Sequence, residues 1–377
     1  MGVNNKGNDR DLITFCHLTT AHPADDPRIY RRECLSLAEF NLGKVTLVAH
    51  GNLNHENIEF ISLGKIPENR INRFVSAQFK SLKLLFKLNP SIWHIHDLEL
   101  VPFGILLTLF RKQVIWDAHE DYYHQFKPEI SYRTYIPIFL RNFLKNFVYL
   151  ILTVLDKRAV AVVAATEEIA KKYGNKNTII VGNETSVEQF EKCVPNFEAR
   201  VAIFTGNMSD QQCFRKIIIA MSEISDINLF VAGRRNEIEI EFATKLLGER
   251  FKHLGWLGPE ELVEVFSKSS FGFVTYEDSP LFTSNRSNKF YEFSAAGLPI
   301  LATPTGANLE LLESSRGGLT SDDFSETSFR TAIVKILSNE NNWKVMSQNS
   351  KVWAHENGNW ESSKKRLLNL YSKLIDN

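Results

Sequence analysis

The sequence has few cysteines, and their spacing indicates neither a disulfide framework nor a zinc site. Its 4 cysteines are scattered over 377 residues, and no two of them form a Cys-x-x-Cys pair. This usage is typical of proteins that fold in a reducing compartment. No uncharged apolar run reaches the ~20 residues that a membrane-spanning helix needs, and residues 1–11 are polar, unlike a secretory signal peptide. We therefore expect a cytoplasmic protein.

The chain also lacks net charge, because 44 Lys and Arg balance 44 Asp and Glu. This balance argues against a nucleic-acid partner held by bulk charge. The apolar content of 44% and the length of the chain predict a globular protein with two domains. The charge is distributed unevenly, since residues 1–185 carry 23 Lys and Arg against 19 Asp and Glu. We expect the N-terminal half to face any anionic partner.

Short apolar runs alternate with helical patterns along the chain, as in the predicted helix at 27–40 that follows the first strand. This alternation predicts an α/β protein with parallel sheets covered by helices on both faces. A looser polar segment at 184–200 interrupts it, and we place the domain boundary there, between 1–185 and a second domain that begins at 186. The predicted strands are 12–18, 44–50, 91–96, 113–119, 159–166 and 177–183, then 201–206, 227–233, 251–258, 271–276 and 299–304.

The loops after these strands are where ligands bind in doubly wound sheets. In the first half they contain Asp26, Arg28, Asp97 and Glu120. Asp26 precedes a proline and fits a helix N-cap, so it either caps the helix or lines a ligand site.

Three histidines, His94, His96 and His119, lie at or near the ends of neighbouring predicted strands. They are buried structural residues, catalytic groups or metal ligands. Their spacing is not diagnostic of a metal site, and we assign neither a metal nor a cofactor.

In the second half, Gly206 and Gly233 each end a predicted strand. Glycine at such a point either lets the backbone approach a ligand closely or forms a plain tight turn. Neither glycine is followed by G-x-G-x-x-G or by G-K-[ST], so a dinucleotide site or a P-loop lacks its motif.

The segment 286–306, RSNKFYEFSAAGLPILATPTG, places Lys289 and Glu292 one turn apart at the start of a helix that Ser287 or Asn288 caps. A helix N-terminus attracts phosphate, and Lys289 adds a full positive charge. Glu292 can accept hydrogen bonds from sugar hydroxyls. A phosphate beside a diol is typical of a nucleotide sugar. The alternative is a surface ion pair worth a few tenths of a kcal/mol.

The stretch SNKFYEFSAAGLPILATPTGANLELL resembles the donor-site segment of GT-B glycosyltransferases of family 4, usually N-K-x-x-E-[YF]-x-A-x-G-x-P. HPADDPRIYRRECLSLAEFNLGKVTLVA, WHIHDLELVPFG and VIWDAHEDYY resemble the acceptor-domain loops of the same family. The resemblance implies two Rossmann-like domains with parallel sheets facing a central cleft. It assigns acceptor binding to 1–185, nucleotide-sugar binding to 186–355, and a helix that crosses back to the first domain to 356–377.

The resemblance also implies roles for individual residues. Glu292 matches the ribose-binding glutamate, Lys289 lies near the phosphates, and Thr305 and Gly306 supply backbone to the donor. His119 matches the histidine beside the reacting sugar. We therefore predict His119 and Lys289 as catalytic residues. The predicted donor-binding residues are Gly206, Gly233, Arg234, Asn288, Lys289, Glu292, Thr305 and Gly306, and the predicted acceptor-side residues are Asp26, Arg28, Asp97 and Glu120.

The chain departs from the family pattern at three positions. Ser284 stands where many members have the first glutamate of E-x7-E, and Asn207 and Gln212 stand near the places of an arginine and a lysine that bind phosphate. We expect Lys289 to take over that charge. The cations that could help it are Arg215, Lys216, Arg234 and Arg286.

The leading hypothesis is a metal-independent glycosyltransferase, retaining like most of the family, that uses a nucleotide-sugar donor and a glycan acceptor. A lipid-linked acceptor in bacterial surface polysaccharide synthesis is the expected context. The alternatives are a nucleotide-sugar epimerase of GT-B fold and a non-catalytic nucleotide-sugar or glycan-binding module.

Two basic segments, 70–88 and 131–155, contain no acidic residue. Each reads as an amphipathic segment that lies on an anionic membrane surface, at the inner face of the plasma membrane, or that packs against the domain's own sheet.

Overall fold

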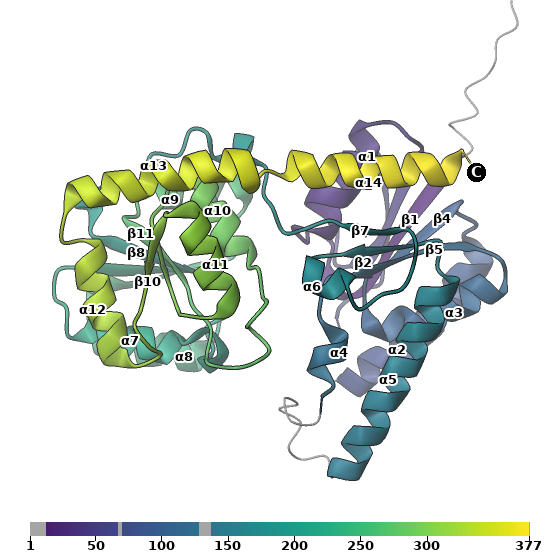
Figure 1. The fold of residues 1–377 in the computed structure, drawn as a ribbon, viewed down its shortest axis with the longest axis horizontal. Helices are drawn as coiled ribbons and strands as arrows, with labels where there is room; N and C mark the ends of the chain where they lie inside the picture. The colour runs from purple at the N-terminus through teal and green to yellow at the C-terminus, as the bar shows by residue number, and fades with distance from the viewer. Residues whose placement is uncertain (1–12, 67–69, 128–136, 377) are drawn as a thin grey trace, which may run out of the picture. The chain divides into compact units, whose positions relative to one another are not determined.

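Each of the two units of the chain is built around its own parallel sheet (Figure 1). The computed structural model describes residues 13–66, 70–127 and 137–376. The first unit comprises Met1–Gly182 together with Glu361–Asn377, and the second comprises Asn183–Trp360. The chain thus returns to the first unit at its C-terminal end.

The sheet of the first unit has seven parallel strands. Its strands are rich in β-branched and aromatic residues, and those at its centre are buried on both faces, as parallel strands covered by helices are. In sheet order the strands are β3 (Ile58–Ser62), β2 (Lys44–His50), β1 (Thr14–Pro23), β4 (Ile92–Ile95), β5 (Gln113–Ala118), β6 (Ala161–Ala164) and β7 (Thr178–Ile180).

Helices cover this sheet, and the first helical segment begins at an aspartate. Oδ1 of Asp26 accepts the backbone N–H groups of Arg28 and Ile29 at 2.9 Å each, which satisfies donors that a helix start leaves unpaired. The helices of the first unit are a π-helical segment (Ile29–Cys34) continued by α1 (Leu35–Glu39), then α2 (Arg70–Lys87), α3 (Val101–Leu109), α4 (Tyr122–Gln125), α5 (Ile138–Arg158), α6 (Glu167–Ala170) and α14 (Trp360–Ile375).

The sheet of the second unit has six parallel strands in the same relative order as the first six of the first unit. Its central strands are buried and apolar. In sheet order they are β10 (Phe251–Gly255), β9 (Asn228–Ala232), β8 (Val201–Thr205), β11 (Phe271–Val274), β12 (Ile300–Ala302) and β13 (Gly318–Thr320). This 3-2-1-4-5-6 order is that of the Rossmann fold, which places ligands at the carboxyl ends of the strands.

The helices of the second unit include one that the site depends on, α10 (Asn288–Ala296), which packs against α13. Gly297 ends α10 with a φ of +70°, a left-handed conformation that favours glycine. The other helices are α7 (Phe214–Ser222), α8 (Glu237–Leu247), α9 (Pro259–Ser267), α11 (Gly306–Ser315), α12 (Glu326–Ile336) and α13 (Glu340–Asn357).

Three local features differ from the sequence expectation. The strands β3 and β13 were not predicted, because each lies at a sheet edge, most of their residues are not fully buried, and their apolar runs are short. The predicted helix at 27–40 begins as a π-helical segment. The segment 184–200, expected to be loose, contains two 3₁₀ turns, and its Val187 and Phe190 are buried in the core of the second unit.

Candidate functional site

The carboxyl ends of β8 and β9 in the second unit bring two glycines into contact. Gly206, which follows β8, has a φ of +117°. A Cβ on Gly233, which follows β9, would lie 2.0 Å from the carbonyl oxygen of Gly206. Only glycine allows such a close approach of two backbone segments. Both glycines therefore lie together at the sheet edge where ligands bind in this topology.

Lys289 reaches the same edge from the first turn of α10. Its side chain is buried, its Nζ donates a hydrogen bond to Oε1 of Gln212 at 2.6 Å, and its Nζ lies over the rings of Phe204 and Tyr276. Burial lowers the pKa of Lys289 to about 7, although Glu292 opposes that shift. A buried amine of this kind gains strongly from an anionic ligand, which would restore its charge.

The start of α10 is arranged differently from an ordinary capped helix. Ser287 occupies the N-cap position, as predicted, but its side chain makes no capping bond. Its hydroxyl instead bonds the hydroxyl of Tyr276 at 3.0 Å. Asn288 begins the helix, and the partly buried Glu292 follows one turn later. The serine side chain thus leaves the first-turn N–H groups to other acceptors.

Thr305 and Gly306 lie at the start of α11, after β12. A Cβ on Gly306 would lie 2.9 Å from the carbonyl oxygen of Thr283, which accepts the N–H of Ala307 at 2.7 Å. Thr305 is buried, and its hydroxyl has no hydrogen-bond partner among the described residues. This hydroxyl is a polar atom that a ligand at the edge of β12 would satisfy.

Most of the cations expected to assist Lys289 are occupied. Arg215 pairs with Glu239, Arg286 pairs with Glu310, and Lys216 donates to a backbone carbonyl. Arg234 is different, because it is exposed directly after Gly233 and makes no ion pair in the described part of the chain. Lys289 and Arg234 are therefore the cations at this edge that remain for an anionic ligand.

In the first unit, Asp97 organises the region after β4. Its Oδ2 accepts the N–H groups of Thr20 and Ala21 at 2.6 and 3.2 Å and the hydroxyl of Thr19 at 2.8 Å. Its Oδ1 lies 3.5 Å from Nε2 of His22. Asp97 thereby fixes the extended end of β1 against the end of β4.

His22 lies between two carboxylates. Its Nδ1 is 3.0 Å from Oδ2 of Asp26, and its Nε2 faces Asp97. Burial opposes a charge on His22, but the bond to Asp26 and the charge of Asp97 outweigh it and raise the pKa of His22 to about 9. Despite burial, the bond to His22 lowers the pKa of Asp26. Asp26 therefore caps the first helical segment and also holds an imidazolium at the strand end.

Arg28 is buried and orients Asp117 at the end of β5. Its Nε and Nη2 donate to the two carboxylate oxygens at 3.1 and 3.0 Å, and its Nη1 donates to the carbonyl of Val181 at 2.8 Å. Burial opposes ionisation of Asp117, but Arg28 and His96 outweigh it and hold its pKa well below the usual value. Arg28, predicted on the acceptor side, is thus occupied with supporting a carboxylate.

His119 lies next to this carboxylate. Its Nδ1 is 3.9 Å from Oδ1 of Asp117 and has no hydrogen-bond partner among the described residues. Burial lowers its pKa, while Asp117 opposes the shift. The ring of His119 meets the ring of His22 edge-on, with centroids 5.2 Å apart. Glu120 is instead exposed, and it accepts a hydrogen bond from Gln125.

Three overlapping groups in the first unit place potential metal-ligand atoms within 4.8 Å of one another. Most of their nitrogen and oxygen atoms already take part in hydrogen bonds or charge pairs, as described for His22, Asp97 and Asp117. The groups are His17, Glu33, His94 and His96; His22, Asp97 and His119; and His96, Asp117 and His119.

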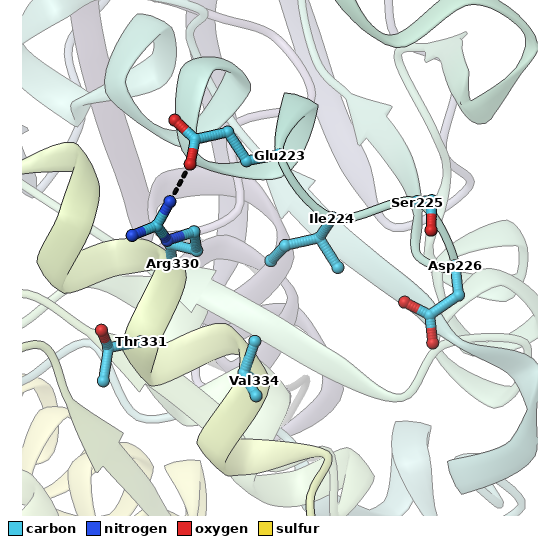
Figure 2. A pocket seen from close by; sticks show the side chains of 7 residues that line it. All are labelled: Glu223, Ile224, Ser225, Asp226, Arg330, Thr331 and Val334. Carbon is cyan, nitrogen blue, oxygen red and sulfur yellow. Dashed lines mark hydrogen bonds and ion pairs between the residues drawn. The ribbon is translucent and has the colours of Figure 1, made fainter.

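A shallow pocket of the second unit lies elsewhere (Figure 2). Its lining residues come from the end of α7, the turn before β9 and one face of α12, and Arg330 pairs with Glu223 across it. It therefore lies at the amino end of β9, whereas ligands of parallel sheets bind at carboxyl ends. None of the predicted site residues lines it.

Comparison with known proteins agrees with this architecture. Residues 199–339 match the family model Glycosyl transferases group 1. The chain has a GT-B fold, and the part of its second unit at 199–339 is similar to the group 1 glycosyltransferase model. The predicted GT-B fold class and the resemblance to GT-B glycosyltransferases are confirmed. Among curated proteins, none matches the chain at a significant level.

Solved structures similar to this GT-B chain cover nearly all of it at low sequence identity. Sucrose-phosphate synthase (tll1590) from Thermosynechococcus elongatus has a TM-score of 0.74 at 17% identity, over 97% of this chain and 99% of that one. Anabaena Alr3699/HepE, in complex with UDP and glucose, has a TM-score of 0.70 at 12% identity, over 96% and 100%. WaaG, a glycosyltransferase involved in lipopolysaccharide biosynthesis, has a TM-score of 0.69 at 13% identity, over 94% and 98%.

Sequence reasoning missed several residues that shape the two strand edges of this GT-B chain. Gln212 was noted only as a lost cation, yet it holds Lys289. His22 and Asp117 were not singled out, although both lie in quoted strand-end segments beside predicted residues. Tyr371 lies in α14, and no local pattern connects it with the histidines that it contacts.

Proposed function

We propose that the chain transfers a sugar from a nucleotide-sugar donor to a hydroxyl group of a glycan acceptor. The second unit binds the donor at the carboxyl edge of its sheet, and the first unit binds the acceptor at its own. The observation that carries the donor assignment is the buried Lys289 beside Gly206 and Gly233. A buried cation without an ion pair among the described residues, next to two glycines that have no side chains, is suited to a diphosphate whose charge grows as the glycosidic bond breaks.

The predicted residues have the following roles in this proposal, except Arg28, which supports Asp117 instead. Lys289 and Arg234 neutralise the diphosphate, Glu292 accepts the ribose hydroxyls, and Asn288, Thr305 and Gly306 complete the donor contacts. His119 lies beside the reacting sugar, and Asp26, Asp97 and Glu120 lie on the acceptor side. Retention of configuration and independence of a metal ion are part of the proposal, and they are supported by the resemblance to family 4. HepE, crystallised with UDP and with UDP-glucose, supports UDP as the first nucleotide to test.

A panel of UDP-, GDP-, ADP- and dTDP-sugars tests donor binding by thermal shift. The sugar that raises the melting temperature most is then supplied with and without glycan acceptors, and the products are separated by mass spectrometry. A transferase yields an extended acceptor or slow donor hydrolysis. An epimerase yields an isomeric donor without an acceptor, and a binding module leaves the donor unchanged, so either product pattern contradicts the proposal.

We further propose that the acceptor is lipid-linked and that the first unit docks on the anionic inner face of a membrane. The support comes from two helices that expose apolar stripes. Their spacing of three and four residues places each stripe on one helix face. The stripe of α2 is Val75, Phe79, Leu82 and Phe86, and the stripe of α5 is Phe139, Phe143, Phe147 and Leu150.

The opposite faces of both helices are used inside the unit. Leu84 of α2 and Val148, Leu152 and Leu155 of α5 are buried in the core, and α3 packs against both helices. Packing against the sheet, the alternative considered from the sequence, therefore accounts for the inner faces and leaves the stripes exposed. Exposed apolar residues gathered on one face mark an interaction surface.

The charge around the stripes complements anionic lipid. Lys83 and Lys87 are exposed on α2 and Lys145 lies on α5, whereas neither helix carries an acidic residue before Asp156. Each such cation contributes about 1 kcal/mol near an anionic bilayer. Arg133, also part of the predicted basic segment, lies outside the described residues. No helix in the described part of the chain is long and apolar enough to cross a bilayer.

Sedimentation with phospholipid vesicles tests this docking surface. We expect binding to vesicles that contain phosphatidylglycerol, weaker binding to pure phosphatidylcholine, and loss of binding in the double variant F79S/F86S. Phe40→Ser, which changes an equally exposed phenylalanine at the end of α1, is the matched control. Equal binding by F79S/F86S, or a dimer of the wild type that the double variant dissolves, contradicts the membrane assignment.

A further inference from the structure

A row of ionisable side chains crosses the buried face of the first sheet. His17 on β1 pairs in register with His94 on β4, and His96, two residues on, lies beside Asp117 of β5. Tyr371 of α14 covers the row from above the sheet. All five side chains are essentially inaccessible to solvent. Because unpaired polar groups are costly inside a protein, the hydrogen bonds of this row determine where its protons lie.

The bonds form one continuous chain. Nδ1 of His96 lies 2.9 Å from Oδ2 of Asp117, and Nε2 of His96 lies 3.1 Å from Nδ1 of His17. Nε2 of His17 lies 3.0 Å from the hydroxyl of Tyr371, and that hydroxyl lies 2.8 Å from Nδ1 of His94. Each distance is that of an ordinary hydrogen bond.

The surroundings of the row favour neutral His17 and His94. Burial lowers the pKa of His17 and His94 well below the usual value. Burial and the charge of Asp117 raise the pKa of Glu33, which faces the row, although Arg28, 3.2 Å away, opposes the shift. Because the neutral form of Glu33 is favoured, Arg28, which lies 3.0 Å from Asp117 and 3.2 Å from Glu33, offsets the charge of Asp117. Together with Arg28, the row then carries no net charge.

With all three histidines neutral, these bonds allow one arrangement of protons. The carboxylate of Asp117 can only accept, so His96 carries its proton on Nδ1 and accepts on Nε2. His17 must then donate from Nδ1 and accept on Nε2, where Tyr371 donates its hydroxyl proton. The oxygen of Tyr371 accepts from Nδ1 of His94, which leaves Nε2 of His94 as a bare acceptor. That nitrogen is buried and has no partner among the described residues.

We propose that Tyr371 is a positioning residue for His119. Tyr371 acts on His119 through three histidines, held as Nδ1–H tautomers, and through Asp117. The chain of bonds and Arg28 fix the Asp117 carboxylate from one side. The Oδ1 atom then faces the unpartnered Nδ1 of His119, 3.9 Å away, and orients that ring with its Nε2 toward substrate. Contacts of this kind often tighten when substrate binds. The consequence for turnover rests on the proposed function, whereas the tautomers do not.

Nitrogen-15 NMR of the full-length protein labelled at its 10 histidines tests the tautomers directly. Long-range couplings from the ring carbon-bound protons distinguish Nδ1–H from Nε2–H. We expect Nδ1–H for His17, His94 and His96 at neutral pH, with assignments from single histidine-to-glutamine variants. A doubly protonated His96 would keep its bond to Asp117, reverse the other three bonds and place the protons of His17 and His94 on Nε2, and that result overturns the proposal. So does metal in stoichiometric amount bound to these rings, since a ligating nitrogen carries no proton.

Tyr371→Phe tests the positioning role, because it removes one hydroxyl and keeps the packing. We expect His94 to lose its fixed tautomer and the ring signals of His119 to shift, with an unchanged circular dichroism spectrum. Turnover should fall by about tenfold with little change in KM, a fraction of the ~10²–10⁴ that a positioned acid–base group contributes. Tyr173→Phe is the matched control, because Tyr173 is another buried tyrosine of the first unit and bonds only Trp116 among the described side chains.

The outcomes separate this inference from the proposed function. If Tyr371→Phe leaves the His119 signals and turnover unchanged, or if Tyr173→Phe changes them equally, the positioning role is wrong. If the wild type has the expected tautomers and the Tyr371→Phe variant shifts the His119 signals, but no donor is ever turned over, the positioning inference survives and the proposed function fails.

Discussion

The two sheets share one strand order but bury different chemistry at their centres. In the first, His17 pairs with His94, and His96 lies beside Asp117. In the second, the corresponding strands β8, β11 and β12 align Phe204, Phe273 and Leu301 in one row. The second core shows that this topology needs only apolar side chains.

The difference indicates what the polar row is for. Burying ionisable groups is costly even when they are paired, so a fold that works without them retains them for another reason. The first unit spreads its charge over a connected network that ends near His119. In the second unit, the buried charge at the sheet edge lies on one amine, that of Lys289, beside Gly206. Removing a single charge should therefore matter more in the second unit than in the first.

The largest expected effect is that of Lys289→Ala. Removing one preorganised donor to a developing charge typically lowers turnover by ~10²–10³-fold, about 3–4 kcal/mol. The loss should fall on kcat more than on KM, because the interaction strengthens as the bond breaks. Lys289→Arg should recover only part, since the guanidinium fork has a different reach.

Lys252→Ala is the control for this change, because Lys252 also lies over a phenylalanine ring in the second unit. Steady-state kinetics with the preferred donor measure both. Near-normal turnover of Lys289→Ala together with an inactive Arg234→Ala variant would show that Arg234, not Lys289, neutralises the diphosphate.

Glu292→Ala should weaken donor binding without unfolding the protein. Two hydrogen bonds from a ribose diol to a carboxylate are worth about 1.5–3 kcal/mol each, so the Kd should rise by roughly a hundredfold or more. Isothermal titration with the nucleoside diphosphate and a thermal melt give both quantities. Glu313→Ala changes an exposed glutamate of α11 and should bind normally. Unchanged affinity of a folded Glu292→Ala variant contradicts the ribose assignment.

Much of the fold can be predicted from the sequence, because parallel strands buried on both faces appear in it as short continuous apolar runs. The run 44–50 matches β2 at both ends, and 113–119 matches β5 to within one residue. Strand β3 escapes this signal, because Glu59 interrupts an edge strand that is only partly buried. The π-helical start at Ile29–Cys34 escapes it as well, since a π-helix has no separate apolar period.

The sequence predicts the residues of the site where one short segment contains them. The stretch around Lys289 and Glu292 gives the helix, its N-cap position and its charge in sequence order. The partners that set the chemistry come from distant segments, as Gln212 does for Lys289 and Tyr371 does for His94. Nothing local predicted that Arg28 would be buried against Asp117, 89 residues away. Such pairings depend on strand order, which a single sequence encodes only through the whole fold.

The pH dependence of donor binding tests the role of the single buried amine that distinguishes the second unit from the first. Burial lowers the pKa of Lys289 to about 7 in the free protein, and a bound diphosphate should raise it again. Below pH 7 the amine is already charged, so affinity should be nearly constant. Above pH 7 binding requires uptake of a proton, so the Kd should rise by up to about tenfold per pH unit.

Titrations with the nucleoside diphosphate between pH 6 and 8.5, in two buffers of different ionisation enthalpy, measure both the affinity and the proton uptake. Lys289→Met should bind weakly at every pH and show no slope. A wild-type Kd that stays flat to pH 8.5 would mean that Lys289 is fully charged before the ligand arrives.

The smallest expected effect is that of chelation, which should change activity by less than about twofold. The argument lies in the protonation of the first unit. A histidine must be neutral to ligate a metal, yet the carboxylates of Asp26 and Asp97 raise the pKa of His22 to about 9. The imidazolium of His22 repels a divalent cation, and it already pairs with the carboxylates of Asp26 and Asp97. Turnover before and after dialysis against EDTA, followed by addition of Mg²⁺, Mn²⁺ or Zn²⁺, measures the effect. Complete loss in EDTA, with recovery on one of these ions, would place a metal among His22, Asp97 and His119 and make the first unit, not Lys289, the main source of positive charge at the site.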